Sequence, residues 1–292
     1  MRITKNNRGT VILFILPGLL LYAYLVLYPI AQSAVLSLFK WDTLASKRFV
    51  GFDNYVSVFS SSLFWKSLNN SLVFMVATTV LQVIIGFFLG YLVYLQLKGF
   101  RLFKTMFFIP AVLPSVAVGF IWSYIYSPSM GLLKPLMTAL GLKAYYIPPL
   151  SDPTLALLAI IIAQTWNSCG IQVILFNSGF MNMPAEVIES ATLDGASGLK
   201  MIWHMIIPLS WDIIKMVIIL QLIGALRAFD LVYVMTGGGP NHATELLAMH
   251  LFVNAFQNFN LGYGNVIAMV IFIMALLITI TMRKLMERDS LY

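Results

Sequence analysis

Long stretches without a charged residue divide the chain. Five of them exceed the roughly 20 residues that an α-helix needs to cross about 30 Å of hydrocarbon. They cover residues 9–39, 67–97, 105–133, 153–185 and 246–282. A sixth apolar stretch, 209–235, is interrupted by Asp212, Lys215, Arg227 and Asp230. Counting it, the pattern predicts six transmembrane helices, over 11–35, 71–96, 105–127, 154–179, 210–235 and 264–283.

Composition supports a membrane protein. The chain is 60% hydrophobic and 10% charged, whereas soluble domains carry about 25% charged residues. We therefore expect an all-α polytopic membrane protein in which residues 1–292 form a single transmembrane domain. The basic start and the apolar run after it resemble a signal peptide. That run is too long for one, so we expect it to be kept as the first helix.

The distribution of Lys and Arg predicts the orientation. Basic residues gather in segments 1–8, 97–104 and 283–288, which lie on one side if six helices are crossed. The positive-inside rule places this side in the cytoplasm. Both termini are then cytoplasmic, and so is the loop between the fourth and fifth helices. The net charge of +7 fits these loops and does not indicate nucleic-acid binding.

Several kinds of chemistry find no support in the sequence. Cys169 is the single cysteine, and the three histidines, His204, His242 and His250, lack metal-ligand spacing. The GxxxxGK[ST] loop that cradles nucleotide phosphates does not occur. We expect no metal site, no catalytic residues and no cofactor in this chain.

The loop between the fourth and fifth helices predicts a helix–turn–helix. Pro184 suits the first position of a helix, and 185–193 reads as a short helix. Gly195 ends that helix because glycine adopts positive φ at little cost. Ser197 can cap a second helix that runs until Pro208. The alternative is an interfacial amphipathic hairpin without a partner.

Polar and small side chains recur at helical spacing on the fourth and fifth helices. Both sets follow the i, i+3, i+4, i+7 pattern of one helix face. Such groups are costly in lipid and line transport paths, although amides and small residues also hold helices together. The candidate substrate-path residues are Gln164, Asn167, Ser168 and Ile171, then Gln221, Gly224, Ala225 and Ala228.

Two charges lie near the end of the fifth helix. Arg227 and Asp230 are spaced i, i+3, so we expect them to form an ion pair. The alternative is that Arg227 contacts substrate, which would indicate an anionic ligand.

The cytoplasmic loop carries a specific motif. Glu189-Ser-Ala191 is followed after three residues by Gly195 and then by Met205-Ile-Ile207-Pro208. This spacing resembles the "EAA…G…IxLP" loop of ABC importer permeases, with mild departures at Ser190, Met205 and Ile207. Asp194-Gly195-Ala196 and the stretches 16–29, 152–176 and 229–244 are similar to the carbohydrate, maltose-type branch. The family core would cover about 69–283, with the coupling loop at 184–208.

The resemblance implies an assembly in the bacterial cytoplasmic membrane. A second homologous permease, an ATP-binding subunit dimer and an extracytoplasmic substrate-binding protein would join this chain, with ATP and Mg held by the ATPase. The coupling residues would be Glu189, Ala191, Asp194, Gly195, Ala196 and Pro208. The two polar helix faces would occupy the positions that line the sugar site in the maltose-type permease.

We therefore expect a permease subunit that imports a sugar or oligosaccharide by ATP-driven alternating access. The alternative substrates are anionic, such as glycerol phosphate or a uronate oligosaccharide. The docking loop disfavours a passive channel or facilitator, and the lack of a catalytic cluster disfavours a membrane enzyme.

Overall fold

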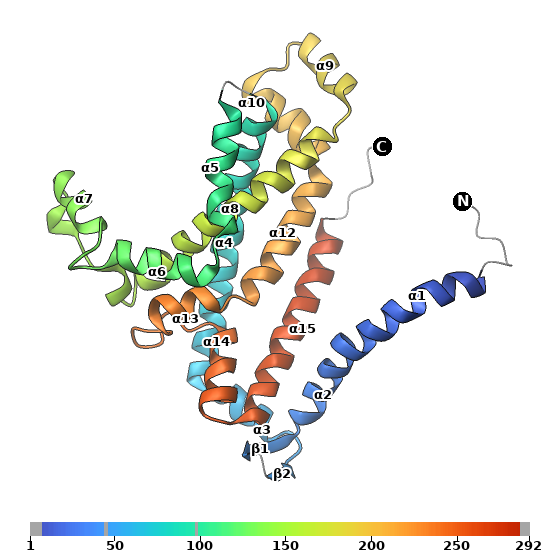
Figure 1. Cartoon of the computed structure of the whole chain (residues 1–292), viewed down its shortest axis with the longest axis vertical. Helices are drawn as coiled ribbons and strands as arrows, with labels where there is room; N and C mark the ends of the chain where they lie inside the picture. Colours follow the sequence, from blue (N-terminus) through green and yellow to red (C-terminus); the bar gives the residue numbers. More distant parts are fainter. Residues whose placement is uncertain (1–7, 44–45, 97–98, 287–292) are drawn as a thin grey trace. The chain divides into compact units, whose positions relative to one another are not determined.

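A computed structural model of the chain describes residues 8–43, 46–96 and 99–286 (Figure 1). The described part is mostly helical, with one short β-hairpin. Segments 1–7 and 287–292, which carry part of the basic charge used to predict orientation, lie outside it. The chain divides into two compact units. Unit 1 comprises Met1–Ser62 and His250–Phe272, and unit 2 comprises Leu63–Met249 and Ile273–Tyr292.

Four helical segments are long and apolar enough to cross a membrane. They are Ile12–Leu36, Ser62–Tyr94 (α4), Ala156–Met181 (α8) and a segment coinciding with α15, Leu261–Leu285. The first consists of most of α1 (Arg8–Tyr22), a π-helical segment (Ala23–Leu27) and α2 (Tyr28–Leu36). Two bent helix pairs, Thr105–Val112 with Ser115–Tyr126 and Gly198–Leu209 with Trp211–Leu226, bring the number of spans to six if each pair counts as one. The predicted membrane architecture is thus confirmed.

The third predicted helix, 105–127, is broken. It forms α5 (Phe100–Val112) and α6 (Ser115–Tyr126), which meet at 106° (Figure 1). Pro114 is the cause, because the residue before a proline is kept out of the helical region. Leu113 accordingly has ψ 136°. The span predicted over 105–127 is thus present as two helices joined by a bend, and the sequence pattern did not predict the bend.

The fifth predicted helix, 210–235, is also broken. It forms α12 (Trp211–Leu226) and α13 (Asp230–Thr236). The last turn of α12 tightens, because Arg227 N donates to Gly224 O (3.2 Å) and Ala228 N to Ala225 O (3.1 Å). Phe229, with φ −142°, then leaves helical geometry. The chain therefore changes direction just where the sequence places its two charges.

Unit 1 contains the β-hairpin, which the sequence did not predict. Strand β1 (Phe39–Thr43) pairs antiparallel with β2 (Ser46–Phe49), and α3 (Asp53–Phe59) follows. Buried Asn54 on α3 donates to Ser37 O (2.8 Å) and to Phe39 O (2.9 Å). These bonds fix the start of the hairpin to α3.

In unit 2, glycines let α4 approach α8. A Cβ on Gly86 would lie 2.4 Å from Gln172 Cβ, and one on Gly90 would lie 2.9 Å from Phe176 Cβ. The GxxxG spacing of α4 is therefore a helix contact, a common use of that pattern in membranes. Phe87, between these glycines, packs edge-on against the Phe176 ring.

The loop after α13 is tied to the first turns of α4. Lys66 Nζ donates to Asn241 O (2.6 Å), and Asn70 Nδ2 donates to His242 O and Glu245 O (3.1 Å each). The Glu245 carboxylate is buried and contacts the His242 ring. The Gly-rich segment before α14 (Leu247–Phe252) is thus held by side chains from a distant part of the sequence.

Candidate functional site

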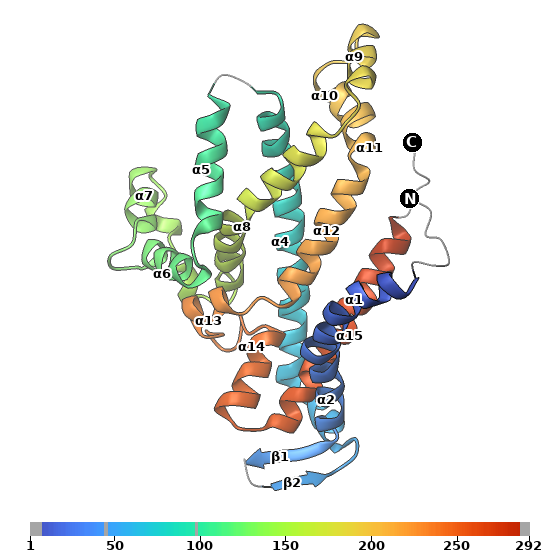
Figure 2. The same cartoon turned by 45° about the vertical axis from the view of Figure 1, so that its right-hand side comes forward.

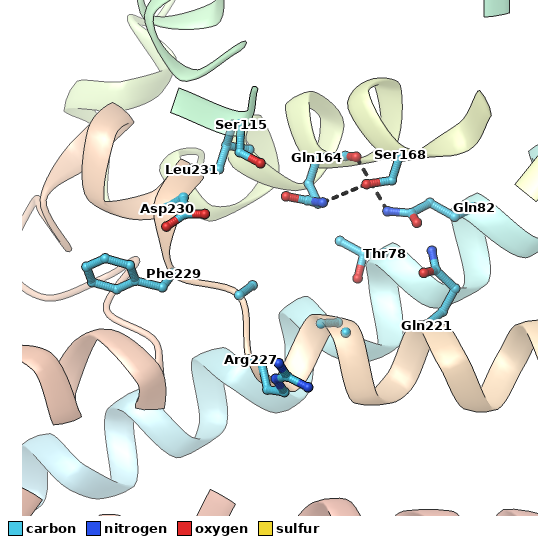
Figure 3. Close-up of a pocket in the computed structure, with 13 residues that line it drawn as sticks. Thr78, Gln82, Ser115, Gln164, Ser168, Gln221, Arg227, Phe229, Asp230 and Leu231 are labelled. Carbon is cyan, nitrogen blue, oxygen red and sulfur yellow. Dashed lines mark hydrogen bonds between the residues drawn. The ribbon is translucent and has the colours of Figure 1, made fainter. Parts of the chain in front are cut away.

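A polar cavity lies within unit 2. Its volume is about 460 Å³, and its walls come from α4, α8, α12, the start of α6, and the segment joining α12 to α13. Figure 3 shows the side chains of Gln82, Gln164 and Gln221 converging on this space from three helices. The lining residues are Thr78, Gln82, Ser115, Gln164, Ser168, Gln221, Gly224, Ala225, Arg227, Ala228, Phe229, Asp230 and Leu231.

The structure brings together most of the residues singled out in the sequence. Gln164 and Ser168 line the cavity from α8, and Gln164 Nε2 donates to Ser168 Oγ (2.8 Å) (Figure 3). All of the α12-side candidates line it too, namely Gln221, Gly224, Ala225 and Ala228. Glycine and alanine leave room there, while the amides and the hydroxyl supply hydrogen-bonding groups.

Asn167 and Ile171 are not among the lining residues. Asn167 is buried, and its Nδ2 donates to Pro110 O on α5 (2.7 Å). In a continuous helix that carbonyl would accept from the N–H four residues on, but residue 114 is a proline and has none. At the α5–α6 bend this carbonyl accepts instead from Leu113 N (3.2 Å), and Asn167 supplies a second donor to it. Ile171 is 48% exposed.

The sequence reasoning missed the wall that α4 provides. Thr78 and Gln82 are each 2% exposed and lie one turn apart on this helix. Their i, i+4 spacing inside an apolar span was a usable signal, since polar groups in such spans seldom face lipid. Ser115 was also missed, because the bend that carries it to the cavity was not predicted.

The predicted pairing of Arg227 with Asp230 was wrong. Both side chains are exposed and line the cavity, yet within residues 8–43, 46–96 and 99–286 no ion pair joins them. An i, i+3 pair needs a continuous helix, and the break between α12 and α13 lies between these residues. Figure 3 shows Arg227 at the end of α12 and Asp230 at the start of α13.

The loop after α8 forms the predicted hairpin. Helix α9 covers Ala185–Leu193, and the second arm comprises α10 (Gly198–Met201), a π-helical segment (Ile202–Ile206) and α11 (Ile207–Leu209). Both arms lie at the end of unit 2 that is far from α13 (Figure 2). Pro184 directly precedes α9 rather than beginning it, and the second arm continues through Pro208.

The turn of the hairpin is a Schellman motif. Ala196 N donates to Ala191 O (2.9 Å), and Gly195 N donates to Thr192 O (3.1 Å). These are the two bonds that close a helix whose next residue is left-handed. Gly195 has φ +85°, a conformation that glycine adopts without steric cost. The expected positive φ at Gly195 is confirmed.

One side of the hairpin is packed and the other is exposed. Ala191, Met201 and Ile206 are buried in a hydrophobic cluster that includes Phe180 of α8. Glu189 is exposed, and the Leu193 side chain is 89% exposed. A groove of about 320 Å³ runs between the arms, lined by Glu186, Val187, Ser190, Ala191, Asp194 and Met205.

Metal chemistry finds no candidate in the described ranges, where no group of three or more His, Cys, Asp and Glu side chains could hold an ion. The site is thus a polar cavity within apolar helices, with a hairpin closed by a Schellman turn at the far end of the same unit.

Comparison with known proteins identifies the family. Residues 82–286 match the binding-protein-dependent transport system inner membrane component family, and the chain belongs to it. The probable ABC transporter permease protein YurN of Bacillus subtilis is 32% identical over 96% of this chain and 97% of its own. The multiple sugar-binding transport system permease protein MsmF of Streptococcus mutans is 30% identical over 94% of each. The resemblance to ABC importer permeases is confirmed.

Solved structures share the fold. A chain from a bacterial alginate ABC transporter, in complex with an alginate pentasaccharide-bound periplasmic protein, superposes with a TM-score of 0.84. The match covers 100% of this chain and 99% of that one at 17% identity. With the family match and the apolar helices, the protein is a multi-pass permease of the cytoplasmic membrane.

Proposed function

We propose that this chain is a membrane-spanning permease subunit of an ABC importer for a sugar or oligosaccharide, and that substrate passes through the unit 2 cavity. One observation carries the proposal: amide and hydroxyl groups from three apolar helices converge on one cavity. Polar groups inside membrane helices are costly and mark transport paths. The relative whose name specifies multiple sugars supports the substrate class.

The cavity has the size and chemistry for a saccharide. Its volume of about 460 Å³ lies within the roughly 300–1,000 Å³ of small-molecule sites. Gln164, Gln221 and Ser168 can donate to sugar hydroxyls and accept from them. Gly224 and Ala225 leave space beside them for a ring. Asn167 bonds to the Pro110 carbonyl at the α5–α6 bend and would not contact substrate, and Ile171 lies outside the cavity.

Transport needs a partner that supplies energy. Moving an equilibrium between two conformations from 1:99 to 99:1 takes about 5.5 kcal/mol of differential interaction. An ATP-binding subunit dimer, holding ATP and Mg, would supply it on the cytoplasmic side, where the positive-inside rule also places both termini. A second homologous permease would complete the membrane domain, and an extracytoplasmic binding protein would deliver substrate.

The 184–208 hairpin would pass movement of the ATPase to the membrane helices. Its packed side is continuous with α8 through the Phe180 cluster, so a push on the hairpin reaches a cavity helix. Glu189 would contact the ATPase, and the other coupling residues expected from the sequence would keep the two arms of the hairpin at a fixed angle. These are Ala191, Asp194, Gly195, Ala196 and Pro208.

A second substrate class is favoured by Arg227. Its guanidinium lines the cavity without an ion-pair partner in the described part of the chain. Guanidinium groups bind carboxylate, phosphate and sulfonate oxygens strongly. An acidic saccharide would therefore find a counter-ion here, and a structurally similar transporter is named for alginate.

The test is ATP-driven uptake by the purified complex in proteoliposomes. Labelled glucose, trehalose, maltotriose, glucuronate and digalacturonate would sample neutral and acidic saccharides. We expect uptake of at least one of them that requires the binding protein and stops when ATP is replaced by a non-hydrolysable analogue. Full ATP-independent flux through the isolated chain would contradict the proposal and indicate a facilitator.

A further inference from the structure

A buried amide pair lies behind the cavity wall. Gln172 of α8 is 3% exposed and does not line the cavity, whereas Gln82 of α4 is 2% exposed and does. Gln172 Nε2 donates to Gln82 Oε1 (3.3 Å). Gln82 Nε2 in turn faces the Gln164 carbonyl oxygen (3.5 Å), a contact drawn in Figure 3. The amide of Gln82, a cavity residue, is thus hydrogen-bonded by Gln172, which lies outside the cavity.

Close helix packing produces this pair. Gly86 follows Gln82 by one turn, and a Cβ there would overlap Gln172 Cβ. Because the helices touch at this point, both long amide side chains are confined between them. Their length then brings the head groups together.

The pair sets the direction of hydrogen bonding at the cavity surface. A terminal amide torsion is roughly two-fold, so an unheld glutamine can present either its oxygen or its NH₂ group. In the structure Gln172 Nε2 donates to the Gln82 oxygen, and the Gln82 NH₂ group faces the Gln164 carbonyl. Because Gln82 lines the cavity, a ligand there could accept from the other hydrogen of this group.

We infer that Gln82 contacts substrate and determines specificity by donating a hydrogen bond to a saccharide oxygen, and that Gln172 is the positioning residue that fixes this donor. The inference rests on the proposed function, because it takes the cavity as the substrate site. The opposing view is that both amides only hold α4 to α8. Interhelical amides commonly do so, and the two views predict different kinetics.

The test is a double-mutant cycle in the complete importer. Gln82→Met, Gln172→Met and the double variant keep side-chain length and remove the hydrogen bonds. The probe is whichever saccharide of the uptake panel the wild type transports. We expect each single variant to raise KM by about three- to tenfold. The double variant should be no worse than Gln82→Met, since Gln172 acts through Gln82.

Thr165→Val is the matched control. Thr165 lies on α8, is buried, and its hydroxyl has no hydrogen-bond partner within the described ranges. The valine has nearly the same shape and should leave KM unchanged.

A second measurement covers the case in which Gln172→Met fails to assemble. Single-deoxy analogues of the transported saccharide should identify one hydroxyl whose removal raises the wild-type KM but not that of Gln82→Met. Additive effects of the two Met variants, or equal loss with every deoxy analogue, would overturn the inference. Saccharide uptake with unchanged KM in both variants would overturn it and leave the proposed function standing. Absence of saccharide uptake by the wild type would contradict both the inference on Gln82 and the proposed function.

Discussion

The hairpin at 184–208 and the cavity are assembled in opposite ways. The turn of the hairpin is closed by backbone bonds among residues 191–196. The cavity combines side chains from Thr78 to Leu231 and depends on two helix breaks. A local element keeps its shape when the rest of the unit moves, which suits a docking element. A cavity shared by several helices changes shape when they move, which suits alternating access.

The largest expected effect lies in the hairpin. Gly195→Val places a β-branched residue at φ +85°, which costs on the order of 1–2 kcal/mol and distorts the Schellman turn. We expect the variant to insert and pair with its partner permease but to lose substrate-stimulated ATP hydrolysis and uptake. A Cβ there would meet no atom of the described chain within 4 Å, so strain and not a clash is the cause.

Gly195→Asn is the matched control, because asparagine tolerates the left-handed region better than valine does. It should retain most of the uptake. Equal loss in both variants would mean that the side chain blocks docking directly, and normal uptake in Gly195→Val would show that the turn angle is unimportant.

A hairpin with this sequence could be predicted, because each of its signals is local. Proline before a helix and glycine after it act within a few residues. The cavity could be predicted only in part. Helical spacing found Gln164 and Gln221, but it could not show that Asn167 would turn to α5. That outcome depends on the helix break before Pro114, where the Pro110 carbonyl accepts from Leu113 N and keeps a second lone pair for Asn167.

The Arg227–Asp230 error has a related cause. Their spacing has meaning only inside one helix, and the sequence between them contains neither proline nor glycine to signal the break. Thr78 and Gln82 were missed for another reason. Their helix is so apolar that it reads as a lipid-facing span, although one of its faces borders the cavity.

A smaller effect is expected at Arg227. Arg227→Gln keeps hydrogen-bond donors and removes the charge, so uptake of an acidic saccharide should fall by about tenfold relative to a neutral one. Competition between glucuronate and glucose measures this ratio. Because the structure shows no pair in the described residues, adding Asp230→Arg to Arg227→Glu should not restore uptake. Rescue by that double reversal would reinstate the ion pair.

The smallest effects are expected at Gln221 and Asn167, which the sequence analysis grouped together as substrate-path residues. Gln221→Leu should raise KM by about threefold and leave thermal stability unchanged. Asn167→Leu should leave KM unchanged and lower thermal stability, because the Pro110 carbonyl loses one of its two donors at a cost of about 1 kcal/mol. Uptake kinetics and thermal melting of the purified complex test this pair. A raised KM with unchanged melting in Asn167→Leu would place Asn167 in the substrate path after all.

Cross-linking tests most directly whether the hairpin transmits ATPase movement to the cavity helices. Ser190 is exposed beside Glu189, and the native Cys169 is buried, so Ser190→Cys offers one accessible thiol on this chain. We expect a cross-link from position 190 to the ATP-binding subunit, with a yield that changes between the nucleotide-free and the ATP-bound complex. Absence of a cross-link from any position in 186–196, with ATP-driven uptake intact, would contradict it.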